Sequence, residues 1–338
     1  MAGRATMREV ADRAGVAIGT VSAVFAGKTW VSARTRTAVR EAAEEIGYTP
    51  PARGLARPAV TDLGFVSWVE EAFSPANPYF ARVLHGAQQA CADHGISLRF
   101  EVADPASAPL PLCVERAEVA GVLVLGHAVD DAYLRRVLDR GVPAVLLECE
   151  PTGLSVDHVR HDDEKGGHLA AAHLLSLGRV PRMPGVVSAD ERITPVRARL
   201  AGLRRALTEA GVGFDPRYVR PGTLDMAGGL RGMTELLALP VPPSTVLCAN
   251  DESALGALEA LRLRGLRVPD DVAVAGYDDI PHAQVSDPPL TTVATDKELV
   301  GAQAVWHLLE RLRRPHIASR DTRLAVRLVK RASTLGGV

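Results

Sequence analysis

From Leu63 onward the sequence alternates between short, continuously apolar segments and longer segments with helical periodicity. In the apolar segments, such as 121–126 and 246–250, polar residues do not alternate with apolar ones, which is typical of strands buried on both faces. Strands that alternate with helices along a chain form parallel sheets covered by helices. The pattern starts again near residue 160. The sequence therefore predicts an α/β fold with two doubly wound parallel-sheet lobes.

The elements of this body are expected at defined ranges. Strands are expected at 63–69, 96–102, 121–126, 143–148, near 186, at 246–250 and at 272–279, and helices at 78–94, 131–140, 163–177, 199–210 and 252–264. Residues 104–118 contain Pro105, Pro109 and Pro111, and proline disrupts the interior of a helix. We expect a short or irregular element there.

Residues 7–48 follow a different pattern, with three short segments in which apolar residues recur at helical spacing. Gly15 separates the first two segments, where a tight turn needs a residue that tolerates a positive φ. Ser32 can cap the third segment. Three short helices with a glycine in the first turn describe an all-α helix-turn-helix unit, which is a DNA-binding motif.

These residues resemble the headpiece of the LacI/GalR family of bacterial transcription regulators. The matching positions are Val10, Ala11, Ala14, Gly15, Val16, Thr20, Val21, Ser22, Val24, Gly27, Val31, Ser32, Thr35, Arg36, Gly47, Tyr48 and Pro50. The body matches family motifs as well, at N-P-x-F (77–80), A-N-D-x-x-A-L-G (249–256), R-G-L-R-V-P-x-D-V-x-V-x-G-Y-D-D (264–279) and P-x-L-T-T-V (288–293). The resemblance thus spans nearly the whole chain.

The resemblance implies a domain organisation and a set of partners. It places a helix-turn-helix headpiece at 1–48, a hinge linker at 49–61 and a periplasmic-binding-protein-like effector-binding and dimerisation domain at 62–338. The N-lobe would comprise about 62–161 and 292–322, and the C-lobe about 162–291 and 323–338. It also implies a homodimer or tetramer on a pseudo-palindromic double-stranded DNA operator, with helices 78–94 and 252–264 as candidate interface elements. A small-molecule effector, such as a sugar or a related metabolite, would close the lobes and change the spacing of the heads.

By the same resemblance, the candidate DNA contacts are Thr6, Ala17, Ile18, Gly19, Thr20, Ser22, Ala23, Ser32, Thr35 and, in the linker, Leu55. Family members usually carry polar residues at the front of the recognition helix and an arginine late in it, where this chain has small and apolar residues. Arginine and glutamine read base edges, whereas isoleucine and alanine contact only thymine methyl groups. Hydroxyl groups can still bind phosphates, which position a protein without reading sequence. We therefore expect DNA binding with little direct base readout.

In the family, the linker forms a hinge helix on DNA, and its leucine wedges into the minor groove at the operator centre. Leu55 is the only leucine available for this role, and it lies closer to Pro50 than in the family pattern. Pro51, Gly54 and Pro58 disfavour a helix. The sequence leaves a hinge helix and a flexible tether open, and it favours the tether.

Polar residues that follow apolar strands are the candidate effector contacts, because ligands of open α/β sheets bind beyond the C-terminal strand ends. Glu148, Asn250 and Asp278 take such positions. A carboxylate there can accept hydrogen bonds from sugar hydroxyls or from a base edge. As alternatives, Asp278 could cap the next turn and Asn250 could cap the helix that follows it.

Matching donors and aromatic faces come from other segments. Arg197 or Arg199 can donate to a ligand, and Tyr79 and Phe80 offer rings for a sugar or a purine. The resemblance favours Asp278, Arg197 and the pair formed by Tyr79 and Phe80, together with Asn250. The alternatives are that Phe80 belongs to the core and that the arginines pair with surface acids.

No pattern in the sequence indicates an enzyme. It contains no G-x-G-x-x-G after a strand, no P-loop and no G-x-S-x-G elbow. His158, His161, Asp162 and Asp163 form the only metal-like cluster, which we interpret as a polar strand-to-helix connection. We expect neither a metal nor another cofactor.

Charge and cysteine usage agree with an intracellular DNA-binding protein. Residues 1–58 hold nine Lys and Arg against five Asp and Glu, so the head carries a net charge of +4 in a chain of net charge −1. A basic head suits phosphate neutralisation, although an ordinary helix surface could also carry this charge. The four cysteines are far apart and are expected as buried thiols. No signal-like or membrane-spanning segment is evident, so we expect a cytoplasmic protein without a membrane partner.

The expected function is a ligand-responsive DNA-binding transcription regulator that represses genes for sugars or small metabolites. The alternative is a small-molecule-binding module whose head has lost specific DNA affinity, which Ala17, Gly19, Ala23 and the proline-rich linker motivate. The sequence leaves the effector, the operator and the direction of the response open.

Overall fold

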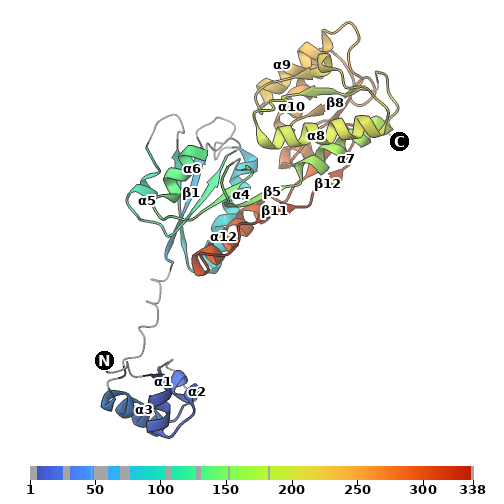
Figure 1. The fold of residues 1–338 in the computed structure, drawn as a ribbon. Coiled ribbons are helices and arrows are strands. Elements are labelled where there is room, and N and C mark those ends of the chain that lie inside the picture. Colours follow the sequence, from blue (N-terminus) through green and yellow to red (C-terminus); the bar gives the residue numbers. More distant parts are fainter. Residues whose placement is uncertain are drawn as a thin grey trace. The chain divides into compact units, whose positions relative to one another are not determined.

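The computed structural model describes residues 6–25, 31–46, 48, 60–68, 77–103, 109–126, 131–150, 153–181 and 183–335. The chain divides into two units, Met1–Val60 and Thr61–Val338 (Figure 1). The first unit is called the head and the second the body. Among the described residues, no helix combines the length and apolarity needed to cross a membrane.

The head consists of the three expected helices, α1 (Met7–Ala14), α2 (Ile18–Phe25) and α3 (Ala33–Glu45). Gly15 follows α1 with φ +65°, the left-handed conformation that a glycine adopts without strain. Thr6 and Glu9 form a reciprocal capping box at the start of α1, and the Ser32 side chain accepts the Thr35 N–H at the start of α3. Buried apolar residues of all three helices form one small core.

The N-lobe of the body is a parallel sheet in the order β11-β5-β4-β3-β1-β2. Its strands are β1 (Asp62–Trp68), β2 (Ser97–Ala103), β3 (Val122–Leu125), β4 (Ala144–Leu147), β5 (Asp157–His161) and β11 (Asp321–Leu324). The helices α4 (Pro78–Asp93) and α12 (Lys297–Arg313) pack together on one face, and α5 (Leu112–Glu115) and α6 (Asp131–Leu138) cover the other (Figure 1). The four-residue α5 agrees with the short element expected in 104–118.

The C-lobe is a smaller parallel sheet in the order β7-β6-β8-β9. Its strands are β6 (Gly185–Val187), β7 (Val219–Arg220), β8 (Thr245–Cys248) and β9 (Ala273–Ala275). The helices α7 (Asp163–Ser176) and α8 (Thr194–Glu209) cover one face, and α9 (Met226–Leu237) and α10 (Asp251–Leu263) cover the other. A 3-10 turn (Pro216–Tyr218) precedes β7, and α11 (Pro281–Val285) follows β9.

Within the part of the body that the structure describes, three segments connect the lobes. The first passes from β5 to α7 at Asp162. The strand β10 (Thr292–Ala294) pairs antiparallel with β12 (Arg327–Val329), and Val293 lies in the C-lobe core. The other two connections therefore lie at 295–296 and 325–326, slightly later than the expected positions near 292 and 322.

The three main helix pairs are packed at backbone contact by reciprocal glycines. In each pair, a Cβ added to a glycine of one helix would overlap a backbone carbonyl oxygen of the other. The contacts are Gly86 with Glu298 and Gly301 with Val83 between α4 and α12, Gly167 with Arg199 and Gly202 with Glu164 between α7 and α8, and Gly229 with Ser253 and Gly256 with Met226 between α9 and α10. This packing explains why the sequence did not predict α9, because its glycines replace the apolar residues that a helical pattern requires.

We predict that Gly301→Ala destabilises the body by about 1–3 kcal/mol, because the new methyl group must push α12 away from α4. Urea unfolding followed by circular dichroism should show a lower midpoint. Gly213→Ala is the matched control, because a Cβ there meets nothing within 4 Å among the described residues. Equal midpoints for the two variants would show that the close approach of α4 and α12 is dispensable.

Candidate functional site

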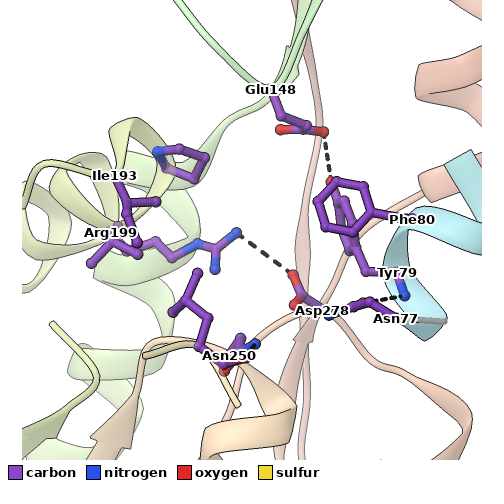
Figure 2. Close-up of a pocket in the computed structure, with 11 residues that line it drawn as sticks. Asn77, Tyr79, Phe80, Glu148, Ile193, Arg199, Asn250 and Asp278 are labelled. Atoms are coloured by element: carbon purple, nitrogen blue, oxygen red, sulfur yellow. Dashed lines mark hydrogen bonds and ion pairs between the residues drawn. The ribbon is translucent and has the colours of Figure 1, made fainter. Parts of the chain in front are cut away.

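A cavity between the two lobes is lined by residues from both (Figure 2). The N-lobe contributes Asn77, Tyr79, Phe80 and Glu148, and the C-lobe contributes Ile193, Pro195, Val196, Arg199, Leu224, Asn250 and Asp278. Three of these residues follow parallel strands, since Glu148 comes after β4, Asn250 after β8 and Asp278 after β9. The fold thus brings the expected strand-end residues together.

Backbone conformations at these strand ends are unusual. Glu148 (φ 58°), Ser188 (φ 59°), Asp278 (φ 107°) and Asp279 (φ 56°) all have positive φ. Residues other than glycine rarely adopt such angles, and the associated strain concentrates at functional sites. The strained backbone at these strand ends therefore supports a functional role for the cavity.

The start of α4 forms the aromatic part of the N-lobe wall. Asn77 caps the helix by accepting the Tyr79 N–H at 2.9 Å, and its amide donates to Glu252 of the C-lobe at 3.2 Å. The rings of Tyr79 and Phe80 meet edge to face with centroids 5.4 Å apart. Both rings are largely buried, so Phe80 belongs to the core and also lines the cavity.

Glu148 is held as a buried carboxylate by two neighbours. The Tyr79 hydroxyl donates to Glu148 Oε1 at 2.6 Å, and His161 Nδ1 lies 2.9 Å from the same oxygen. Burial opposes ionisation of Glu148, but the charge and hydrogen bond of His161 outweigh burial and lower the pKa of Glu148. Burial and the neighbouring Glu148 charge raise the pKa of Tyr79 well above its usual value, so this hydroxyl keeps its proton.

Arg199 supplies the cation of the C-lobe wall. Its Nε donates to Asp163 at 2.8 Å, one terminal nitrogen donates to the Ala249 carbonyl at 2.6 Å, and the other lies 3.6 Å from Asp278 Oδ1. The guanidinium also lies 3.7 Å above the centre of the Tyr277 ring. Burial disfavours its charge, but Asp163 and Asp278 outweigh burial and raise the pKa of Arg199.

Asp278 is the least satisfied charged group of the cavity. Its Oδ1 is buried and accepts no hydrogen bond from the described residues. Burial raises the pKa of this carboxyl to about 6, against the opposing charge of Arg199. Lys297 donates to the Asp278 carbonyl oxygen and not to its side chain. The side chain is therefore free to accept a hydrogen bond from a ligand.

Asn250 caps α10, which is the alternative role that the sequence left open for it. Its Oδ1 accepts the Ser253 N–H at 3.0 Å, and its Nδ2 donates to the Leu224 carbonyl at 2.9 Å. The amide also lines the cavity. Asn250 therefore orders the cavity wall, whatever contact it makes with a ligand.

Arg197, a candidate effector contact from the sequence, lies outside the cavity. This residue is exposed and donates to the Glu191 carbonyl and to Thr194, and it does not line the cavity. The helix α8 begins at Thr194 and not at Arg199. Residues two apart on a helix point about 200° away from each other, so only one of Arg197 and Arg199 can face the cleft.

Several lining residues were missed from the sequence, namely Asn77, Ile193, Pro195, Val196 and Leu224. Asn77 had a detectable signal, because Asn before Pro78 is a typical helix start. Ile193, Pro195 and Val196 belong to the first turn of α8, which the expected start at 199 left out. Leu224 lies in a connection without any pattern.

The residues proposed from the sequence as a metal-like cluster separate in the structure. His158 lies 3.2 Å from Asp321, whereas His161 contacts Glu148. Residues three apart on a strand point to opposite faces of the sheet, which explains the separation. Within the described ranges, no group of three His, Cys, Asp or Glu side chains is placed to hold a metal ion.

In the head, Ala17, Ile18, Gly19 and Ser22 are exposed, and Thr20 is half-buried. Ala23 was expected at the DNA surface, but it is 7% exposed and packs in the core of the head. Ala23 is buried together with Val21 and Val24 of α2, which pack against the other helices of the head.

The other expected DNA contacts of the head have structural roles as well. Thr6 and Ser32 cap helices, and Thr35 is paired with Ser32 through their hydroxyl groups. Leu55 lies outside the described residues.

Comparison with known proteins agrees with both units. A model described as bacterial regulatory proteins, lacI family, matches residues 6–51, and one described as a periplasmic binding protein-like domain matches residues 171–334. The HTH-type transcriptional repressor PurR of Pasteurella multocida is 31% identical over 315 residues, which cover 91% of this chain and 92% of PurR.

Two solved structures are similar over nearly the whole chain. A complex of the transcriptional regulator CelR with cellobiose has a TM-score of 0.72 and 32% identity, covering 98% of this chain and 100% of that one. The lac repressor dimer bound to operator and the anti-inducer ONPF has a TM-score of 0.71 and 28% identity, covering 99% and 100%. The chain therefore belongs to the LacI family of bacterial transcriptional repressors, which are not enzymes and which bind DNA and small-molecule effectors.

Proposed function

We propose that this protein is a homodimeric repressor that binds a pseudo-palindromic operator and responds to a sugar or a related small metabolite in the cleft between its lobes. The observation that carries the effector assignment is the buried Asp278 carboxylate, whose Oδ1 lacks a hydrogen-bond donor among the described residues. A buried polar group without a partner costs free energy, and a ligand that donates to it recovers that cost.

The other walls of the cleft support a hydroxylated ring as the effector. Glu148 accepts and Arg199 donates on the polar side, while the apolar side is formed by Ile193, Val196 and Leu224. A sugar or nucleoside presents hydroxyl groups at its edge and an apolar face, so it matches both sides. Cellobiose, which is bound in the CelR complex, is a ligand of this chemical type.

Effector binding can reach the head through the lobes. The cavity is built from both lobes, which are connected by three short segments, so a ligand that contacts both walls favours the closed arrangement. In a dimer, this closure would change the spacing of the two heads and thereby the affinity for two operator half-sites.

A second copy of the chain is the partner that this model needs, because one head reads one half-site. The edge strand β2 exposes Phe100 and Val102, and Leu112 of α5 is exposed as well. Of the two helices expected at the interface, α4 uses Val83, Ala87 and Cys91 within the N-lobe. The exposed side chains of β2 therefore support the homodimer better than the buried face of α4 does.

We predict that Asp278→Asn stabilises the protein near neutral pH. Folding raises the pKa of this carboxyl from 3.8 to about 6, so its ionisation removes stability as the pH rises through that interval. The variant should gain about 1–3 kcal/mol at about pH 7 and almost nothing at about pH 4. Thermal unfolding at both pH values, followed by circular dichroism, measures this difference.

The control for this experiment is Asp139→Asn, which changes an exposed carboxylate and should leave both midpoints unchanged. If Asp278→Asn instead lowers the unfolding midpoint at about pH 7, the charge of Asp278 stabilises the folded protein. That result would contradict the assignment of this charge to ligand binding.

Footprinting of the purified protein on its own upstream region, across a salt series, tests the operator assignment. We expect a protected palindrome, bound at least about 10³-fold more tightly than a scrambled fragment of equal length at the same salt. Uniform, steeply salt-dependent binding without a footprint would refute operator recognition. The protein would then be a small-molecule-binding module with non-specific DNA affinity.

A further inference from the structure

The first turn of α2 contains an apolar side chain whose position the fold of the head does not explain. Ile18 is 52% exposed, whereas Val21, Val24 and the other large apolar residues described in the head are buried or half-buried. An apolar side chain gains free energy only when it leaves water. The exposed part of the Ile18 side chain is therefore available for contact with another molecule.

The next residue, Gly19, has no internal role either. A Cβ added to Gly19 would meet nothing within 4 Å among the described residues, and its φ is not positive. This differs from Gly15, whose φ of +65° requires glycine. Glycine in a helix is less favourable than alanine by up to about 1 kcal/mol. Gly19 thus lowers the stability of α2 without any packing benefit in the head.

Both residues lie on the side of α2 that faces away from the core. Ala17, Ile18, Gly19 and Ser22 are exposed, while Ala23 packs inward. In a helix-turn-helix unit, the N-terminal residues of the second helix enter the major groove. An open surface of small residues around one isoleucine allows the helix backbone to come close to base edges.

We propose that the first turn of α2 reads thymine methyl groups, with Ile18 packed on a C5-methyl group and Gly19 providing the space for close approach. The methyl group of thymine is the apolar feature of the major groove and distinguishes A·T from G·C pairs. This inference rests on the proposed operator binding and adds the chemical feature that is read. Specificity then comes from shape and apolar contact, in place of bidentate hydrogen bonds.

The test begins with selection of bound sequences from a random duplex library by the full-length protein. The selected half-site should contain thymine at one or more fixed positions. Replacing each such thymine by deoxyuridine removes only the methyl group, and should weaken wild-type binding by about fourfold per methyl contacted. In Ile18→Ala the same replacement should have almost no effect, because the side chain that meets the methyl group is gone.

Gly19→Ala provides a second test with effects of opposite sign. The variant should slow hydrogen exchange of the α2 amides by up to about fivefold, since alanine favours the helix. It should also weaken binding to the selected half-site, because the added methyl group holds the helix away from the bases. Thr37→Ala, on the exposed side of α3, is the control and should leave DNA affinity unchanged.

The outcomes separate this inference from the proposed function. A selected half-site without fixed thymines, or unchanged wild-type affinity on deoxyuridine, overturns methyl readout while leaving operator binding intact. Tighter or unchanged DNA binding by Gly19→Ala overturns the role of Gly19. If selection enriches no sequence, operator recognition and methyl readout both fail.

Discussion

Backbone-to-backbone packing of three helix pairs determines where the walls of the cleft lie. Gly167 lies against the backbone of Arg199, so the spacing of α7 and α8 sets the position of the guanidinium. The contact of Gly229 with Ser253 sets the position of α10, which Asn250 caps. The contact of Gly86 with Glu298 sets the position of α4. Closely packed protein interiors transmit small displacements. The cleft is therefore positioned by contacts that have no adjustable side chain between them.

Two buried ion pairs lie on this scaffold beside the cleft. Glu148 is paired with His161 on the N-lobe side, and Arg199 with Asp163 on the C-lobe side. Such pairing offsets the free-energy cost of removing charges from water. Asp278 lies 3.6 Å from Arg199, and its Oδ1 accepts no hydrogen bond from the described residues. A ligand that enters the cleft therefore meets one group that still requires a donor.

The sequence predicted the fold better than the details of the cleft. Most strands and helices expected between 63 and 264 agree with the structure to within a few residues, because apolar periodicity is a local property, but β5 and β7 were not predicted. The start of α8 was placed at 199 although the helix begins at Thr194, and the resemblance favoured Arg197 over Arg199. The helix α9 was missed, because Gly228, Gly229 and Gly232 interrupt its apolar pattern where α9 packs closely against its neighbours.

The sequence by itself determined the family, the two-lobed α/β architecture and the strand-end positions of Glu148, Asn250 and Asp278, since each follows from motifs or from periodicity along a few residues. The tertiary structure decided which side chains are available. It turned Ala23 into the core of the head, left Ile18 exposed, and connected Glu148 to His161. These outcomes depend on contacts between segments far apart in the chain, which no local pattern contains.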